Sequence, residues 1–241
     1  MRLLNFKLLI ISVLILISAL NSTAQNGTYV TVQDLELWSA VEVKYKLNKR
    51  WSFQLEEQWR LKDNARITDQ YFTELSATRT FKKKLFVTIG GRYIGENDNV
   101  GKIQGYENHL RWMFDLGYKQ KMNRFELQGR VRYQTKNELG ISKEEGDLAD
   151  NTLRFKLASE YNIPKWKFDP ELSGEIFRDV SDLKDFSKFR FTVGTSYSFK
   201  KLGKLAAFYR LEKQLNTTYP KTTNIVAVKY AYTFKHKKND K

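Results

Sequence analysis

Hydrophobic and polar residues alternate along most of this chain, and the longest uninterrupted example runs from Phe189 to Leu211. Mostly apolar or aromatic residues hold one register up to Phe199, and small or polar residues hold the other. After a basic link at 200–203 the alternation resumes. A period of two places one set of side chains on each face of a β-strand. Two such strands of about ten residues, joined by a short turn, are typical of a hairpin that crosses a bilayer.

The same alternation recurs along the rest of the chain and predicts an all-β, antiparallel, up-and-down transmembrane β-barrel. Eleven clear strands are expected at 35–47, 51–61, 71–81, 85–93, 110–118, 125–133, 153–161, 166–176, 189–199, 205–211 and 224–234. Single-chain bacterial barrels normally have an even number of strands, so about twelve are expected. A short strand within 27–32 would supply the twelfth, whereas loss of the first strand from the wall would leave about ten.

Short and long connections alternate, and they differ in charge. The short ones are basic, at 48–50, 82–84, 119–123, 164–165 and 200–201, whereas the loops at 95–107, 135–150 and 178–187 hold most of the acids. Barrels usually have short periplasmic turns and long external loops. Basic turns would then meet anionic headgroups of the inner leaflet. Glu57 is the one clear flaw, because it falls on the outward register.

The first 24 residues have the pattern of a signal peptide. Arg2 and Lys7 are followed by an apolar stretch at 8–20 and by small residues before Gln25. That stretch is shorter than the roughly 20 residues of a spanning helix. We therefore expect 1–24 to be removed and 25–241 to form one outer-membrane β-barrel domain. The absence of cysteine excludes disulfides and thiolate metal sites.

The net charge of +15 is compatible with nucleic-acid binding. Export argues against that partner, and the basic turns account for the charge through contact with lipid headgroups. The expected partners are outer-membrane lipid and, during insertion, the barrel-assembly machinery. The barrel is expected to be a monomer.

Several short segments resemble a known family. They are Leu37-Trp38-Ser39, the segment 51–60, Gly90-Gly91-Arg92-Tyr93 and the segment 209–212. On these residues the chain resembles the uncharacterised outer-membrane barrels of Bacteroidota that are defined as a domain of unknown function. The resemblance covers the whole mature chain and implies an outer-membrane location. It brings no activity and no site residues.

Charged residues on the inward register are the candidate functional residues. We expect a lumen charge ladder of Glu56, Arg60, Arg92, Arg111, Glu126, Arg130, Arg132, Arg154, Glu175, Arg190, Arg210 and Glu212. Buried charges need partners, so one interpretation is a narrow lumen filled by ion pairs. The other is a constricted polar pore for small or anionic solutes. The sequence leaves the choice between structural, binding and narrow-channel roles open.

Two alternatives belong to other functional classes. One is a lipid- or lipopolysaccharide-modifying enzyme with His109 as its base, although no serine motif accompanies that histidine. The other is an exported soluble β-sandwich, which would not explain basic turns and acidic loops. No cofactor is expected, and neither histidine has metal-ligand spacing.

The last strand is a candidate assembly signal. Tyr230, Tyr232 and Phe234 share the outward register, and an exposed terminal strand can pair with the edge of another sheet. Such signals commonly end in an aromatic residue at the terminus, whereas a basic tail at 235–241 follows Phe234 here.

We expect Phe234→Ala to lower insertion into the outer membrane of cells far more than Phe199→Ala does. Both variants should fold alike from urea into detergent, because each loses one outward aromatic side chain. Membrane fractionation of cells measures the difference. Similar insertion of the two variants would leave Phe234 as an interfacial anchor only.

Overall fold

The computed structural model of the protein describes residues 32–82, 84–98, 104–142, 144, 149–180, 186–200 and 202–236. These residues form eleven β-strands: β1 (Val32–Lys46), β2 (Trp51–Lys62), β3 (Ile67–Phe81), β4 (Leu85–Asp98), β5 (Gly105–Met122), β6 (Phe125–Glu138), β7 (Asp150–Tyr161), β8 (Phe168–Asp179), β9 (Phe186–Phe199), β10 (Gly203–Gln214) and β11 (Lys221–Lys235). Each corresponds to one segment of alternating sequence. No helix in this described part of the chain is long and apolar enough to span a membrane.

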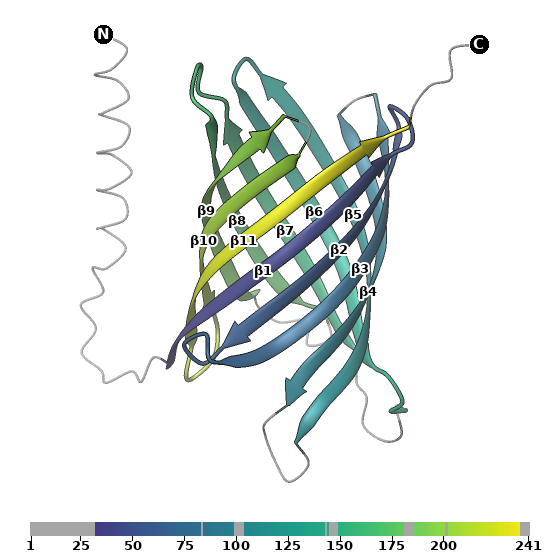
Figure 1. The fold of residues 1–241 in the computed structure, drawn as a ribbon. Coiled ribbons are helices and arrows are strands. Elements are labelled where there is room, and N and C mark those ends of the chain that lie inside the picture. Colours follow the sequence, from purple (N-terminus) through teal and green to yellow (C-terminus); the bar gives the residue numbers. More distant parts are fainter. Residues whose placement is uncertain are drawn as a thin grey trace. The chain divides into compact units, whose positions relative to one another are not determined.

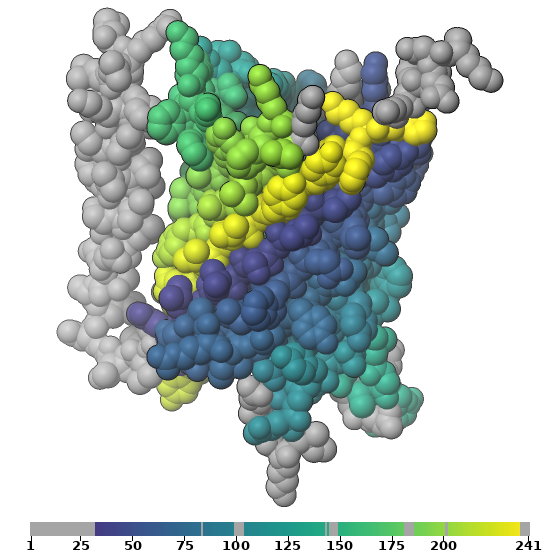
Figure 2. All heavy atoms as spheres, viewed as in Figure 1, coloured from purple at the N-terminus to yellow at the C-terminus, as the bar shows by residue number. Residues whose placement is uncertain are grey.

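The strands form one closed barrel, which confirms the predicted fold class (Figure 1). Consecutive strands pair antiparallel, but β1 and β11 close the barrel in parallel, in register from Val32↔Lys221 to Lys46↔Lys235. An odd number of alternating strands leaves the first and the last running in the same direction, so their pairing has to be parallel. The proposed twelfth strand within 27–32 falls almost wholly outside the described residues. In Figure 2 side chains cover the seam between β11 (yellow) and β1 (purple).

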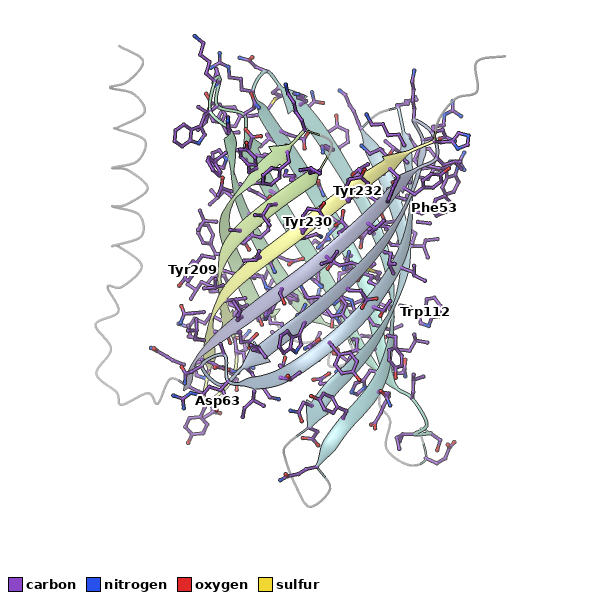
Figure 3. All side chains as sticks on the ribbon, in the orientation of Figure 1. Phe53, Asp63, Trp112, Tyr209, Tyr230 and Tyr232 are labelled. Carbon is purple, nitrogen blue, oxygen red and sulfur yellow. The ribbon has the colours of Figure 1, made fainter. Side chains whose placement is uncertain are left out.

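The inside and outside registers are those that the sequence predicts. Along β1, Leu37 and Val41 are exposed on the outer face, whereas Trp38 is 4% exposed and points into the lumen. Figure 3 shows Trp112 and Tyr209 directed away from the wall at opposite sides of the barrel. The outer surface is therefore apolar and the lumen mostly polar, as in a barrel that lies in lipid.

The connections at the long-loop end are shorter than predicted. The segment 62–70 is expected to be a loop, yet only 63–66 separate β2 from β3. The loop predicted at 95–107 contracts to 99–104, and that at 135–150 to 139–149. Ladder hydrogen bonds do not require apolar side chains, so the strands continue beyond the segments where apolar and polar residues alternate, as β4 and β5 do up to Asp98↔Gly105. The strict alternation of short and long connections is therefore wrong at β2–β3.

Large inward side chains cover glycines on neighbouring strands. Phe208 lies across Gly194, its pairing partner on β9, and Phe86 lies across Gly117 on β5 in the same way. A Cβ atom at either glycine would collide with the facing ring. These glycines therefore let aromatic rings lie flat against the inner wall, which pins the strand register.

Hydrogen-bonded tyrosines mark the outer surface near the long-loop end. The hydroxyl groups donate to asparagine side chains on the next strand: Tyr93 to Asn108 (2.7 Å), Tyr133 to Asn151 (3.0 Å) and Tyr209 to Asn224 (2.6 Å). At the opposite end, Trp166, Phe168, Tyr197 and Phe199 contact one another in sequence. Amphipathic rings at both rims are typical of interfacial girdles.

Glu57 does lie on the outer face, and no bulge removes it. It pairs with Thr73 on β3, whose hydroxyl donates to its carboxylate at 2.9 Å. The bulge in this ladder is further along, between Arg60 and Leu61. This hydrogen bond therefore gives one oxygen of the outward carboxylate a partner. Glu57 interrupts the apolar outer register, as the sequence predicts.

We expect Val193→Arg to lower the free energy of unfolding by about 2–4 kcal/mol, the range for arginine near the midplane of a barrel wall. Val193 is exposed near the centre of β9. Gln54→Arg is the control, because Gln54 lies inside and lines a polar cavity. Reversible folding into lipid vesicles measures both variants. Equal losses would contradict the inside–outside assignment.

Candidate functional site: the charged lumen

The lumen contains two cavities. The first has a volume of about 590 Å³ and extends toward the long-loop end, where Asp179 and Gln214 contribute to its wall. The second has a volume of about 650 Å³ and extends toward the short turns, where Asn48 and Lys49 contribute. Arg130 and Arg132 line both cavities. The side chains of these two arginines therefore lie between the two cavities.

Ion pairs connect neighbouring and more distant strands across this region. Arg132 on β6 makes two hydrogen bonds to Asp115 on β5, at 2.6 and 2.8 Å. Glu175 on β8 accepts hydrogen bonds from Arg130 at 2.7 Å and from Arg154 at 2.9 Å. Charge-assisted pairs of this kind are strong and geometrically specific.

Glu175 is the hub of the network, since Arg190 on β9 also lies 3.6 Å from its carboxylate. Arg190 donates in addition to Glu212 on β10 at 2.8 Å. On the other side of the barrel, Arg92 on β4 donates to Glu74 on β3 at 2.8 Å. We call this set the lumen belt: Glu74, Arg92, Asp115, Arg130, Arg132, Arg154, Glu175, Arg190 and Glu212.

Positive charge exceeds negative charge around the first cavity. Twelve arginines and lysines line it, against five acidic side chains. Arg111 is flanked across the strands by Arg92 and Lys136, and its buried Nε has no hydrogen-bond partner. Eight of these twelve bases have a carboxylate within 4.0 Å, partly from acids that do not line the cavity. Among the described residues, four of the lining bases have none: Arg60, Arg111, Lys156 and Arg210.

Inward aromatic rings stack with the guanidinium groups. The Cζ atom of Arg60 lies 3.7 Å from the ring centre of Trp38, and that of Arg92 lies 3.6 Å from the ring centre of Phe72. Arg154 lies over Phe177 at 4.5 Å. Such cation–π contacts hold long side chains against the wall. The sequence analysis did not single out Phe72 or Phe177, although both occupy inward positions beside outward apolar neighbours.

The structure places the predicted ladder residues unevenly. Ten line the first cavity: Glu56, Arg60, Arg92, Arg111, Arg130, Arg132, Arg154, Glu175, Arg190 and Arg210. Glu212 joins them through Arg190. Glu126 lies apart, paired with Lys119 near the short turns. Asp115, which is outside the predicted ladder, is the only partner within 4.0 Å of Arg132 among the described carboxylates.

His109 is 7% exposed and lies inside, near the long-loop end. Its Nε2 is 3.5 Å from Glu107 and 3.8 Å from Glu96, and it makes no hydrogen bond. No serine or threonine hydroxyl among the described residues is hydrogen-bonded to it, so the proposed base has no activated nucleophile there. Within the same residues no group of three potential ligands is placed to hold a metal ion.

Tyr230, Tyr232 and Phe234 lie on the outer face of β11, two of them labelled in Figure 3. Tyr232 and Phe234 contact each other edge-to-face at 4.6 Å. Phe234 is paired with Tyr45 of β1, so this strand is not a free edge in the closed barrel. Their role as an assembly signal stays a prediction.

Comparisons with known proteins show the family but no activity. The sequence profile described as "Protein of unknown function (DUF2490)" matches residues 35–223. No curated protein matches the chain. Among solved structures, the β domain of the Bordetella autotransporter BrkA aligns with a TM-score of 0.44 at 10% identity, over 72% of this chain and 79% of that domain.

We expect Glu175→Gln to lower the free energy of unfolding by about 3 kcal/mol, because it leaves buried guanidinium groups without their shared counterion. Glu126→Gln is the control, since Glu126 makes a more exposed pair worth less than about 1 kcal/mol. Urea unfolding in detergent measures both. If Glu175→Gln costs no more than Glu126→Gln, water in the cavities already screens the belt.

Proposed function

Since the chain belongs to the family described as protein of unknown function (DUF2490), we propose its role from the geometry of the lumen. The protein is a bacterial outer-membrane barrel with a narrow passage for small hydrophilic solutes, and the passage favours anions. The observation that carries this proposal is that two cavities meet at a barrier made only of side chains, Arg130 and Arg132 among them.

The membrane location is supported by the two registers of the wall. Apolar side chains cover the outer face between two aromatic rims, and the short turns are basic. The proposal includes removal of a signal peptide at 1–24, a monomeric barrel 25–241 and insertion by the barrel-assembly machinery. It also includes an origin in Bacteroidota, which rests on the sequence resemblance alone.

The belt suits a constriction better than a permanently filled core. Side chains such as Arg132 and Arg130 can change rotamer without breaking any ladder hydrogen bond, whereas a backbone plug could not. A purely structural lumen would also contain paired charges, so the ion pairs of the belt do not by themselves distinguish the two roles. The cavities on both sides and the unbalanced positive charge favour a passage instead.

Selectivity follows from the same charges. A pore lined by arginine and lysine rings attracts anions and repels cations. Arginines and lysines line the first cavity toward the long-loop end. Further bases line the second cavity near the short turns: Lys44, Lys46, Lys49, Arg50 and Lys84. An anion would therefore meet positive charge on both sides of the belt.

We expect the double variant Asp115→Ser/Arg132→Ser to raise single-channel conductance in planar bilayers at least threefold. It replaces a large arginine and its aspartate partner by small serines and leaves the net charge unchanged, so the anion preference should persist. The control is Asp34→Ser/Lys221→Ser, which removes another ion pair, outside the lining of both cavities. Its conductance should match that of the parent barrel.

Two results would overturn the proposal. If the parent protein and the Asp115→Ser/Arg132→Ser barrel both failed to conduct, the lumen would be a closed, structural interior. If the protein fractionated from cells as a soluble protein without detergent, the membrane location itself would fail.

A further inference from the structure

Two arginines of the first cavity have a common aromatic neighbour but no counterion. The Cζ atoms of Arg60 on β2 and Arg210 on β10 lie 3.7 and 5.1 Å from the ring centre of Trp38 on β1. The two guanidinium groups are therefore no more than about 9 Å apart, the sum of those distances. All three side chains line the cavity.

Neither guanidinium is neutralised locally. Within the described residues no carboxylate lies within 4.0 Å of Arg60 or of Arg210. The Nε of Arg60 donates to the neutral side chain of Gln58 at 2.7 Å. Arg190 lies 5.3 Å from Trp38 and brings a third positive charge, which Glu212 and Glu175 already share. Neighbouring arginines thus repel the charge on Arg60, and Glu36, an acid that interacts with it, makes no direct ion pair with it.

Unpaired charge inside a protein is costly unless a counterion completes the site. Elsewhere in this lumen the chain supplies that counterion, as Asp115 does for Arg132 and Glu74 for Arg92. Around Trp38 it does not. The carboxylate of Glu36 accepts a hydrogen bond from the indole Nε1 of Trp38 at 2.8 Å and makes no ion pair with either guanidinium.

We propose that Arg60 and Arg210 bind one oxyanion group, a phosphate or carboxylate, of a small solute that enters the first cavity from the long-loop end. A guanidinium presents a planar fork that matches such oxygens bidentately, at about 2.8 Å. A cavity of about 590 Å³ accommodates a small organic anion.

The proposal rests on the lumen of the proposed function but not on conduction, so the test uses binding to the purified barrel in neutral detergent. Inorganic phosphate is the probe, titrated by calorimetry and by thermal unfolding at an ionic strength held constant with chloride. A ligand that binds only the folded state raises the melting temperature by mass action. We expect phosphate to stabilise the parent barrel.

Arg60→Gln/Arg210→Gln should weaken phosphate binding at least tenfold. In phosphate-free buffer this variant should melt no lower than the parent, because it loses two uncompensated charges. Arg66→Gln/Arg124→Gln, on exposed turns outside both cavities, is the control with the same change of charge, and it should bind like the parent. If the glutamine variant fails to fold, Arg60→Lys/Arg210→Lys provides the test, since it keeps the charge but loses the bidentate fork and should also bind more weakly.

Three outcomes would overturn the inference. In the first, the parent barrel shows no phosphate-dependent shift. In the second, the variants at positions 60 and 210 bind phosphate like the parent. In the third, phosphatidylglycerol added to the micelles stabilises the barrel and phosphate does not, which would assign the oxyanion to a lipid headgroup. None of these depends on conductance, so they are distinguishable from failure of the passage.

Discussion

Closure of the sheet is the constraint on which the rest of the structure depends. In hydrocarbon every backbone N–H and C=O group needs a partner within the protein, and a sheet satisfies them all only if its first and last strands pair. Here β1 and β11 pair along their whole length, although they run in the same direction. The resulting wall has no open edge to attract another chain. It also makes all inward side chains share one narrow interior.

That shared interior explains the chemistry of the lumen. Arginines from β2, β4, β6, β7, β9 and β10 project into one space, where each needs a carboxylate, an aromatic face or a solute. Glu175 forms ion pairs with three of these arginines. The rings of Trp38, Phe72 and Phe177 make cation–π contacts with arginines of the same interior. The supply of acids is smaller than the supply of bases in the first cavity. The proposed preference for anions rests on Arg60, Arg111, Lys156 and Arg210, the lining bases that have no carboxylate within 4.0 Å among the described residues.

Two places in the interior bear on the proposed function, His109 and the lumen belt. His109 is buried between two glutamates and is hydrogen-bonded to no hydroxyl group of the described residues. The belt, by contrast, separates two cavities through side chains alone. Charged side chains between cavities of about 590 and 650 Å³ are suited to selecting small solutes. A change of side-chain rotamer there would leave the ladder hydrogen bonds of the wall intact.

The sequence by itself determined the strands, their two faces and the set of charges that point inward, because a period of two is a local property. It did not determine where strands end, since the backbone pairing of β4 and β5 continues past the residues that alternate between apolar and polar. It also did not show that the closing pair is parallel.

Only the tertiary structure decided which charges meet. Arg130 and Glu175 are 45 residues apart, and Lys229 and Glu56 are 173 apart, yet both pairs are hydrogen-bonded. Arg60 and Arg210 likewise converge on Trp38 only because the sheet curves round and closes. Such partners depend on strand register and barrel curvature, which no local pattern of residues encodes.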